Sequence, residues 1–316
     1  MLDLRSSFPA AGAMLYLDAA HQTPLSIPVR AALDAFLDEA LLEAGPKPRW
    51  LARVEEVRGR LAVLLGVDPG EVAFTKNTSE GLNIAARGLR WEPGDNVVLL
   101  AEEHPNNVYA WLALREQGLE VRLAPRDKPW ADAATFAPLV DERTRAIAVS
   151  HVMFHTGQRN DVESIAGLGV PVVVDAMQSV GVLPVDAARV AALAAGSHKG
   201  MLIPQGLGFL VTRSAALRPT YIATAGIAGS PDDQFAEPGP VRLREDARRF
   251  EIGNHNLPAI HALGAALDLI GGAGVPAIEQ HVLALGDLLI DRLDALGIAL
   301  VGPRERERRS HIYVLR

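Results

Sequence analysis

Short apolar runs alternate with helical segments through the middle of the chain. The runs "NVVLL" at 96–100, "AIAVS" at 146–150 and "VVVD" at 172–175 are almost unbroken in their hydrophobicity. Strands that are buried on both faces have this composition, and parallel strands need a crossover segment between them, usually a helix. The alternation therefore predicts an α/β fold in which a mostly parallel sheet is covered by helices on both faces.

Further elements are expected on both sides of this region. Apolar residues recur at helical spacing in five segments, 28–43, 50–66, 133–140, 257–271 and 275–297. The run "GLGFLVTR" predicts a further pair of strands at the same sheet, and "IALVG" and "HIYVL" predict the last two strands.

The order of these elements predicts two domains. We expect a large domain at 14–245 and a smaller α+β domain formed by 1–13 and 246–316. Because the chain stops directly after a predicted strand, with no helix to cover it, we expect the C-terminal part of the small domain to be incomplete.

Composition narrows the classes of partner. The net charge is -7 at pH 7, whereas binding to nucleic acid or anionic membranes needs clustered Lys and Arg. The 316 residues contain no cysteine, so they hold no disulfide and no cysteine nucleophile or ligand. There is no signal peptide pattern and no uncharged apolar run of ~18 residues. We expect a cytoplasmic protein with a small-molecule substrate and no metal, nucleic-acid or membrane partner.

Two ionisable residues stand after apolar strands. Asp175 ends "VPVVVD", at the carboxyl end of a predicted parallel strand, where α/β sheets bind their ligands. Lys199 follows "AALAAGSH", and burial there would lower the pKa of its amine and make it a nucleophile toward a carbonyl. Taken singly, Asp175 is more typical of a helix N-cap or turn aspartate, and Lys199 is also consistent with a surface lysine in a turn.

Together the two residues match the arrangement that holds pyridoxal phosphate (PLP), in which a lysine binds the aldehyde and an aspartate faces the ring nitrogen. A phosphate site is predicted where "TKNTSEGLN" begins a helix, with Asn77, Thr78 and Ser79 at its N-terminus. The alternative there is an ordinary capped helix. His104 in "EEHPNN" is a candidate for stacking on the ring, although a lone loop histidine is more often a surface residue.

These residues lie in segments that resemble the class V aminotransferase family of fold-type I PLP enzymes, which includes cysteine desulfurases and isopenicillin-epimerase-like proteins. The matching segments span residues 16 to 260 in the family's order: "YLDAAHQTP", "FTKNTSEGLN", "EEHPNNVYAW", "SHVMFHTGQ", "VVVDAMQSVGVLPVD", "GSHKGMLIPQGLGFL" and "RRFEIGNHNLPAI". The resemblance implies a large domain with a mostly parallel seven-stranded sheet and a homodimer.

The resemblance also implies roles for single residues. Lys199 would bind the PLP aldehyde, Asp175 would pair with the ring nitrogen, and His104 would stack on the ring; these three are the expected catalytic residues. Gln178 would bond the ring hydroxyl oxygen. Thr78 and His198 would hold the phosphate, and Asn254 would reach a phosphate across a dimer interface.

The chain departs from the family pattern on the expected substrate side. Phe154 and His155 stand where desulfurases commonly have Asn and its neighbour, and His21 is an unusual polar group near the expected substrate pocket. The substrate-binding candidates are therefore His21, Phe154 and His155. In relatives, the arginine that binds the substrate carboxylate and the catalytic cysteine of desulfurases would fall beyond residue 316.

The sequence thus predicts a PLP-dependent enzyme that acts on an amino acid or amine through an external aldimine. A cysteine desulfurase-like or C–S lyase-like reaction is expected first, then epimerisation, then transamination by a class V aminotransferase. A different class stays open, an inactive PLP-binding relative with an interaction role. A nicotinamide enzyme is remote, because "GAGVPA" at 272–277 follows a helix and contains Pro276.

Overall fold

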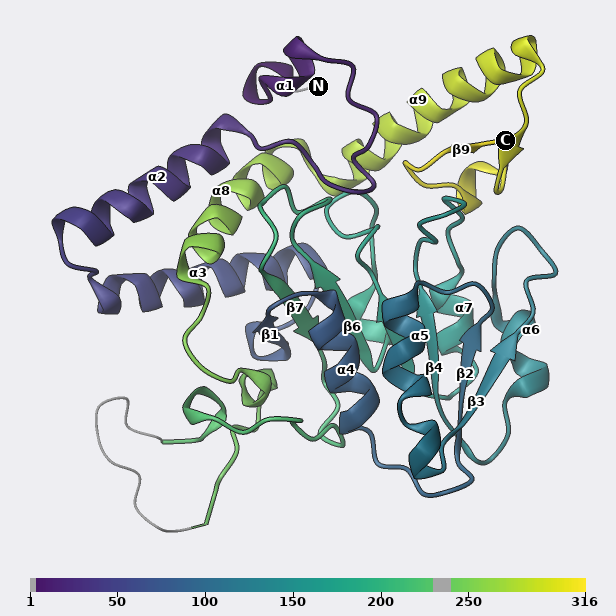
Figure 1. Ribbon diagram of the computed structural model, residues 1–316, viewed down its shortest axis with the longest axis horizontal. Coiled ribbons are helices and arrows are strands. Elements are labelled where there is room, and N and C mark those ends of the chain that lie inside the picture. The colour runs from purple at the N-terminus through teal and green to yellow at the C-terminus, as the bar shows by residue number, and fades with distance from the viewer. Residues whose placement is uncertain (1–3, 230–239) are drawn as a thin grey trace.

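The computed structural model describes residues 4–229 and 240–316, and a seven-stranded sheet lies at its centre (Figure 1). The strands are β1 (Val72–Thr75), β2 (Asn96–Leu100), β3 (Glu120–Ala124), β4 (Thr144–Ser150), β5 (Val172–Asp175), β6 (Ala192–Gly196) and β7 (Gly208–Val211). Their spatial order is β1-β7-β6-β5-β4-β2-β3. Only β7 runs antiparallel to its neighbours within this sheet. The predicted mostly parallel seven-stranded sheet is confirmed.

The helices of the described residues are α1 (Ala10–Ala13), α2 (Ile27–Leu42), α3 (Lys47–Leu65), α4 (Thr78–Gly88), α5 (Pro105–Leu112), α6 (Ala133–Phe136), α7 (Val162–Ala166), α8 (Leu257–Ala273) and α9 (Val275–Leu296). Each of the five segments predicted from helical spacing contains one of them, and four of these agree with the predicted bounds to within three residues. No pattern in the sequence predicted α1. The helix expected at 133–140 is shorter, because a 3₁₀ turn that contains Pro138 follows Phe136. The strand pair expected in "GLGFLVTR" was wrong: β7 alone fills the space between β1 and β6.

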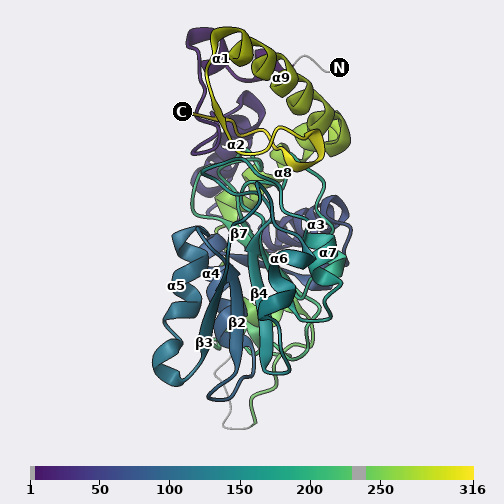
Figure 2. The ribbon, with the colours of Figure 1, turned by 90° about the vertical axis from the view of Figure 1, so that its right-hand side faces the viewer.

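Both faces of the sheet are buried by helices. One face packs Val97, Leu99 and their neighbours against α4 and α5. The other face packs Val98, Val149 and their neighbours against α3, α7 and α8. Figure 2 shows the sheet edge-on between these two layers. Successive strand residues point to opposite faces, so an unbroken apolar run serves both cores at once.

A smaller group of elements lies beyond the carboxyl ends of the parallel strands (Figures 1 and 2). It comprises α9 and the antiparallel pair β8 (Leu300–Val301) and β9 (Val314–Leu315), with α1 nearby. This arrangement is compatible with the predicted division at 14–245, and the domain boundaries stay a prediction. Residues 1–3 of the predicted small domain lie outside the described residues, as do 230–239 of the large one.

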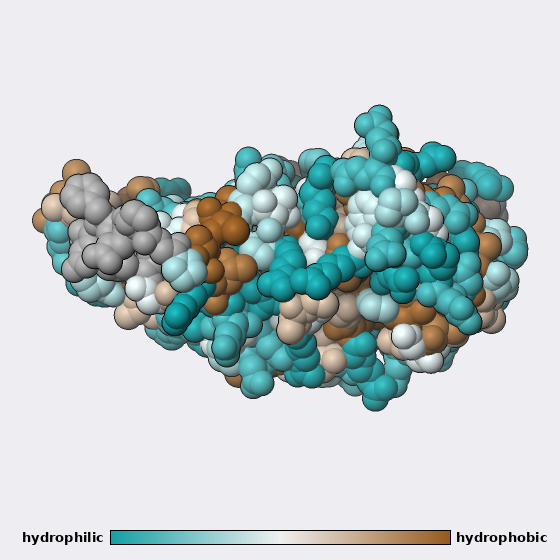
Figure 3. Space-filling view, turned by 90° about the horizontal axis from the view of Figure 1, so that it is seen from below, coloured by the Kyte–Doolittle hydropathy of each residue, from teal (hydrophilic) through white to brown (hydrophobic). Residues whose placement is uncertain are grey.

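Two surface properties bear on partners. Within residues 4–229 and 240–316, no helix alone is long and apolar enough to cross a membrane; α8 and α9 reach that length and hydropathy only as a pair bent by 71°. The face seen in Figure 3, at the opposite end of the molecule from α9, is mostly hydrophilic, and its hydrophobic atoms form small separate areas.

Candidate active site

A cavity of about 220 Å³ lies at the carboxyl ends of the central strands. It is lined by the start of α4, the loop after β2, the ends of β4 and β5, and the loop after β6. Its residues are Asn77, Thr78, Ser79, His104, Asn106, Ser150, Val152, Phe154, Asp175, Met177, Gln178, His198 and Lys199. The fold thus brings nine of the twelve predicted site residues together, Phe154 among them, and Asp175 and Lys199 share the same cavity.

Asp175 is the last residue of β5 and is buried. Its carboxylate accepts one hydrogen bond, from Met177 N at 2.9 Å. Burial raises the pKa of Asp175, and the charges of His104 and Lys199 oppose that rise. A buried carboxylate with a single backbone donor is incompletely satisfied, so the position favours a cationic or N–H partner in the cavity.

Lys199 lies in the loop after β6 and lines the same cavity as Asp175. Burial lowers the pKa of its amine, and the charges of Asp175 and Asp18 partly offset that effect. The N-terminal segment holds the lysine backbone, because Thr23 Oγ1 donates to Lys199 O at 2.7 Å and Thr23 N donates to His198 O at 3.0 Å. An amine of lowered pKa is more often neutral, and the neutral form is the nucleophile.

The beginning of α4 closes one end of the cavity. Asn77 is the N-cap residue, and its side chain accepts from Glu80 N at 2.9 Å. Thr78 Oγ1 donates to Met177 Sδ at 3.1 Å. A Cβ atom on Gly208 would lie 2.7 Å from Asn77 Cα, so glycine is needed for β7 to approach this helix end. The free amides of a helix N-terminus, with two neighbouring hydroxyls, are suited to bind an anion.

His104 begins α5, and its ring contacts the Phe154 ring edge-on, with centroids 5.0 Å apart. Its Nδ1 accepts from Asn106 N at 3.2 Å, so in the neutral imidazole the proton is on Nε2. Burial lowers the pKa of His104, Asp175 raises it and Lys199 lowers it. The histidine is therefore held as a mostly neutral, oriented ring beside the cavity.

Gln178 and His198 supply further polar groups. Gln178 is buried; its Nε2 donates to Ala20 O at 3.1 Å, and its Oε1 has no partner. Such an unpaired buried amide oxygen calls for a ligand or another donor. Burial lowers the pKa of His198, and the charges of Lys199 and His21 lower it further.

Three predicted residues do not line this cavity. His155 turns toward Glu102 and Arg126, with its Nε2 3.3 Å from Glu102 Oε2 and from Arg126 Nη1. His21 is exposed and adjoins the site through its charge on His198. Asn254 is exposed. Asn256, two residues later, is the N-cap of α8. Their expected roles stay predictions.

The structure adds residues that sequence patterns did not indicate. Ser150, Val152, Asn106 and Met177 line the cavity. His311, near the end of the chain, has its pKa lowered to about 4, first by burial and then by the charge of Lys199. Ser150 could have been found as the residue that ends the strand beside Asp175, whereas His311 follows no motif.

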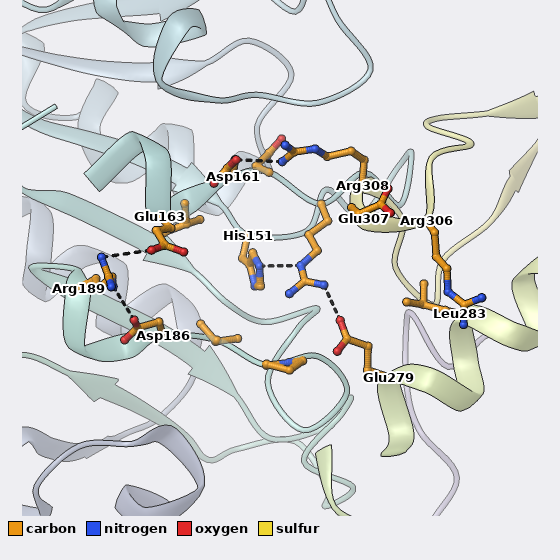
Figure 4. A pocket seen from close by; sticks show the side chains of 15 residues that line it. His151, Asp161, Glu163, Asp186, Arg189, Glu279, Leu283, Arg306, Glu307 and Arg308 are labelled. Atoms are coloured by element: carbon orange, nitrogen blue, oxygen red, sulfur yellow. Dashed lines mark hydrogen bonds and ion pairs between the residues drawn. The ribbon is translucent and has the colours of Figure 1, made fainter. Parts of the chain in front are cut away.

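A second cavity, of about 610 Å³, lies between the loops after β4 and β5 and the C-terminal segment (Figure 4). Each arginine that lines it is paired with a carboxylate: Arg159 with Glu279, Arg189 with Glu163 and Asp186, Arg306 with Asp287, and Arg308 with Asp161. The arginines that line this larger cavity are thus neutralised by nearby carboxylates.

Comparison with known proteins agrees with this geometry. The model of the family described as Aminotransferase class-V matches residues 15–315. The chain belongs to the class-V aminotransferase family.

Relatives within this family include an uncharacterised protein of Schizosaccharomyces pombe, 39% identical over 96% of this chain and 73% of its own length. A probable cysteine desulfurase of Methanothermobacter thermautotrophicus is 32% identical over 91% of this chain and 74% of its own length. Among solved structures, the apo cysteine desulfurase of Thermococcus onnurineus is similar with a TM-score of 0.89 and 26% identity, over 99% of this chain and 81% of that one.

A further structure of similar fold is a mutant of C-DES with glycine covalently linked to its PLP cofactor. It has a TM-score of 0.88 and 26% identity, over 96% of this chain and 84% of that one. The class-V chain described here is therefore cysteine desulfurase-like in sequence and fold.

Proposed function

We propose that this protein is a PLP-dependent enzyme that acts on a sulfur-containing amino acid and cleaves its carbon–sulfur bond. The observation that carries the proposal is that Lys199, Asp175 and the start of α4, which suits an anion, line one cavity. Relatives named as cysteine desulfurases and a C-DES structure with PLP support the choice of chemistry.

The residues of the cavity fit PLP. The unpaired Oε1 of Gln178 and the incompletely satisfied Asp175 are polar groups that await partners, and the start of α4 suits a phosphate dianion. When bound, PLP supplies an aldehyde that captures amines and a protonated pyridine that withdraws electrons from the substrate α-carbon.

The residues of this chain then have separate tasks. Lys199 would hold the aldehyde, and its amine, when free, would carry a proton to and from the substrate α-carbon as general base and acid. Asp175 would keep the ring nitrogen protonated, His104 would stack on the ring, and Gln178 would bond the ring hydroxyl oxygen. Asn77, Thr78, Ser79 and His198 would hold the phosphate. Of the three substrate-binding candidates, Phe154 lines the cavity and would shape its substrate side.

The fate of the sulfur follows from composition. The 316 residues contain no cysteine, so none of them can accept sulfur as a persulfide. Sulfur released in the cavity would leave as a product, as in a C–S lyase, or pass to a thiol outside these residues. Transamination and epimerisation are the alternatives, because all three reactions begin with proton removal at the α-carbon.

We also infer a homodimer. Leu37, Leu41 and Leu42 of α2 are exposed apolar side chains, and Asn254 is exposed where the family resemblance expects it to reach a second copy. Light scattering at several concentrations tests this inference, and a monomer at all of them contradicts it.

The experiment on the cofactor is direct. The purified protein, supplied with PLP, should develop a visible absorbance, and borohydride should fix a pyridoxyl group on the peptide that contains Lys199. A Lys199→Ala variant should lose this adduct, whereas Lys47→Ala, a change at an exposed lysine, should keep it. The same adduct in Lys199→Ala would contradict the assignment.

The reaction is tested with the loaded protein. Cysteine and cystine should release sulfide or persulfide together with a keto acid or alanine, and alanine offered alone should change the spectrum without forming sulfide. Spectral inertness toward every amino acid would instead indicate a PLP-binding protein without this activity.

A further inference from the structure

A second buried carboxylate lies directly behind the candidate active site. Glu103 follows β2 and precedes His104, and its side chain is almost inaccessible, with the residue 5% exposed. None of the roles assigned above uses it. A carboxylate is expensive to bury, so its surroundings should show what holds it there.

Four donors converge on the Glu103 carboxylate. Ser150 N donates to Oε1 at 2.6 Å and Ser150 Oγ donates to Oε2 at 2.6 Å. His104 N and Asn107 Nδ2 also point to Oε2, at 3.2 and 3.3 Å. One side chain thereby joins the end of β4, the residue that begins α5, and the first turn of α5.

Ser150 connects this carboxylate to Asp175. The two residues are register partners at the ends of β4 and β5, and Ser150 lines the cavity. Its carbonyl oxygen accepts from Asn160 Nδ2 at 2.8 Å, so the residue is fixed from both sides. The bonds from Glu103 therefore set the position of the strand end beside Asp175 and, through His104 N, of the ring that faces the cavity.

The charge on Glu103 is also controlled. The pKa of Glu103 is raised to about 7. Burial is the largest cause of the rise, and the charge of Asp175 adds to it, whereas the hydrogen bonds from Ser150 and Asn107 lower the pKa. His104 and Lys199 act in turn on Asp175. Asn107 Oδ1 is buried without a partner, so a turn of that amide gives a protonated Glu103 an acceptor.

We propose that Glu103 is a positioning residue of the active site, which holds Ser150 against Asp175 and fixes the His104 ring on the cofactor side of the cavity. The inference rests on the proposed function, because the groups it positions are those expected to hold PLP. Glu103 itself does not line the cavity, so it acts through its neighbours.

Three substitutions separate positioning from simple bulk. Glu103→Ala leaves Ser150 N, Ser150 Oγ and His104 N without their buried acceptor. Glu103→Gln has the same size and keeps an oxygen for Ser150 N. The Ser150 hydroxyl and a turned Asn107 amide can accept from its N–H groups, so only the longer bond from His104 N is lost. Ser150→Ala removes one of the two strongest bonds and leaves Glu103 in place.

The test measures PLP affinity and the visible circular dichroism per mole of bound PLP, which reports how firmly the ring is oriented. Glu103→Ala should bind PLP ~10–100-fold more weakly and show a reduced visible signal, because buried donors are left unpaired. Glu103→Gln should restore both values to within about threefold of the unmodified protein. Ser150→Ala should fall between them. Glu116→Ala, a change at an exposed acid after α5, should have no effect.

The outcomes distinguish the two proposals. If the unmodified protein carries no PLP on Lys199, the proposed function fails and the role of Glu103 falls with it. If PLP binds to Lys199 but Glu103→Ala retains full affinity and the full visible signal, the positioning role alone is overturned. Should Glu103→Ala not fold, the affinity and visible signal of Ser150→Ala decide, since unchanged values there overturn the role as well.

Discussion

Burial shifts the pKa values of Asp175 and Lys199, which line the same cavity, in opposite directions. It raises the pKa of Asp175 and lowers that of Lys199, since in both cases it disfavours the charged form. Their mutual attraction opposes both shifts. The cavity thus holds an amine and a carboxylate whose charged forms burial disfavours, and the carboxylate would gain from a cationic partner such as the protonated pyridine of the proposed cofactor.

The proton on Glu103 gives the protein a pH-dependent stability at the residue scale. The pKa of Glu103 in the folded protein is about 7, against an ordinary value of 4.5. The folded state therefore retains a proton that the unfolded chain has released. The stability associated with this proton is complete below about pH 4.5 and is lost as the pH rises through about 7.

Glutamine does not titrate in this range. Between pH ~5 and ~8, the free energy of unfolding of Glu103→Gln should therefore rise by about 3 kcal/mol relative to that of the unmodified protein. Urea denaturation across that range measures the difference. His151, whose pKa burial lowers to about 3, contributes equally to both proteins and cancels. A difference that is constant with pH would contradict the prediction.

At the scale of elements, the anion site depends on how closely a strand approaches a helix. Gly208 opens β7 directly beside the N-cap of α4, and an added Cβ would lie 2.7 Å from Asn77 Cα and 2.8 Å from Ala195 O. These are backbone atoms, so a larger residue cannot be accommodated by turning a side chain. The position of the first turn of α4 is set by this contact.

Gly208→Ala should therefore destabilise the protein by about 1–3 kcal/mol. It should also weaken PLP binding, because the added Cβ would displace the start of α4, the proposed site of the PLP phosphate. Thermal unfolding with and without PLP measures both effects. Gly271→Ala is the matched control: an added Cβ there meets nothing within 4 Å, and alanine is the better helix former. Equal PLP affinity in the two variants would show that the start of α4 is not the phosphate site.

For the whole molecule, an ion pair and hydrogen bonds join the C-terminal segment to the loop after β4. Arg159 Nη1 lies 2.5 Å from Glu279 Oε1 of α9, and the two side chains are 23% and 21% exposed. Arg159 N donates to Arg308 O at 2.7 Å, and Ser310 Oγ donates to Gly157 O at 2.8 Å. The loop after β4 thus contacts the active-site cavity at one end and the C-terminal segment at the other.

Glu279→Gln should lower the free energy of unfolding by about 1 kcal/mol, because the pair is partly shielded from water. Asp294→Asn removes the partner of Arg304 from a pair in which both side chains are 52% exposed, and should change stability by no more than about 0.5 kcal/mol. Chemical denaturation of the two variants makes the comparison. A larger loss in Asp294→Asn would show that burial does not decide these contributions.

Local patterns were sufficient for the sheet and for part of the site. The apolar runs that end at Ser150 and Asp175 predicted the strands, and the helix start at Asn77 was readable because capping depends on adjacent residues. The direction of the His155 side chain could not be predicted from the sequence, because its partners Glu102 and Arg126 come from other parts of the chain. For the same reason a pair of strands was predicted where β7 alone lies, since its pairing with β1 and β6 decides its extent.

The sequence by itself determined a mostly parallel α/β sheet with a lysine and an aspartate after two of its strands, because hydrophobic periodicity and the order of elements along the chain are local properties. Only the tertiary structure decided that Glu103 is bonded to Ser150 behind Asp175, that Gln178 Oε1 is unpaired, and that His311 reaches the charge of Lys199. Such contacts join residues that are distant in the chain, and no spacing along the sequence encodes them.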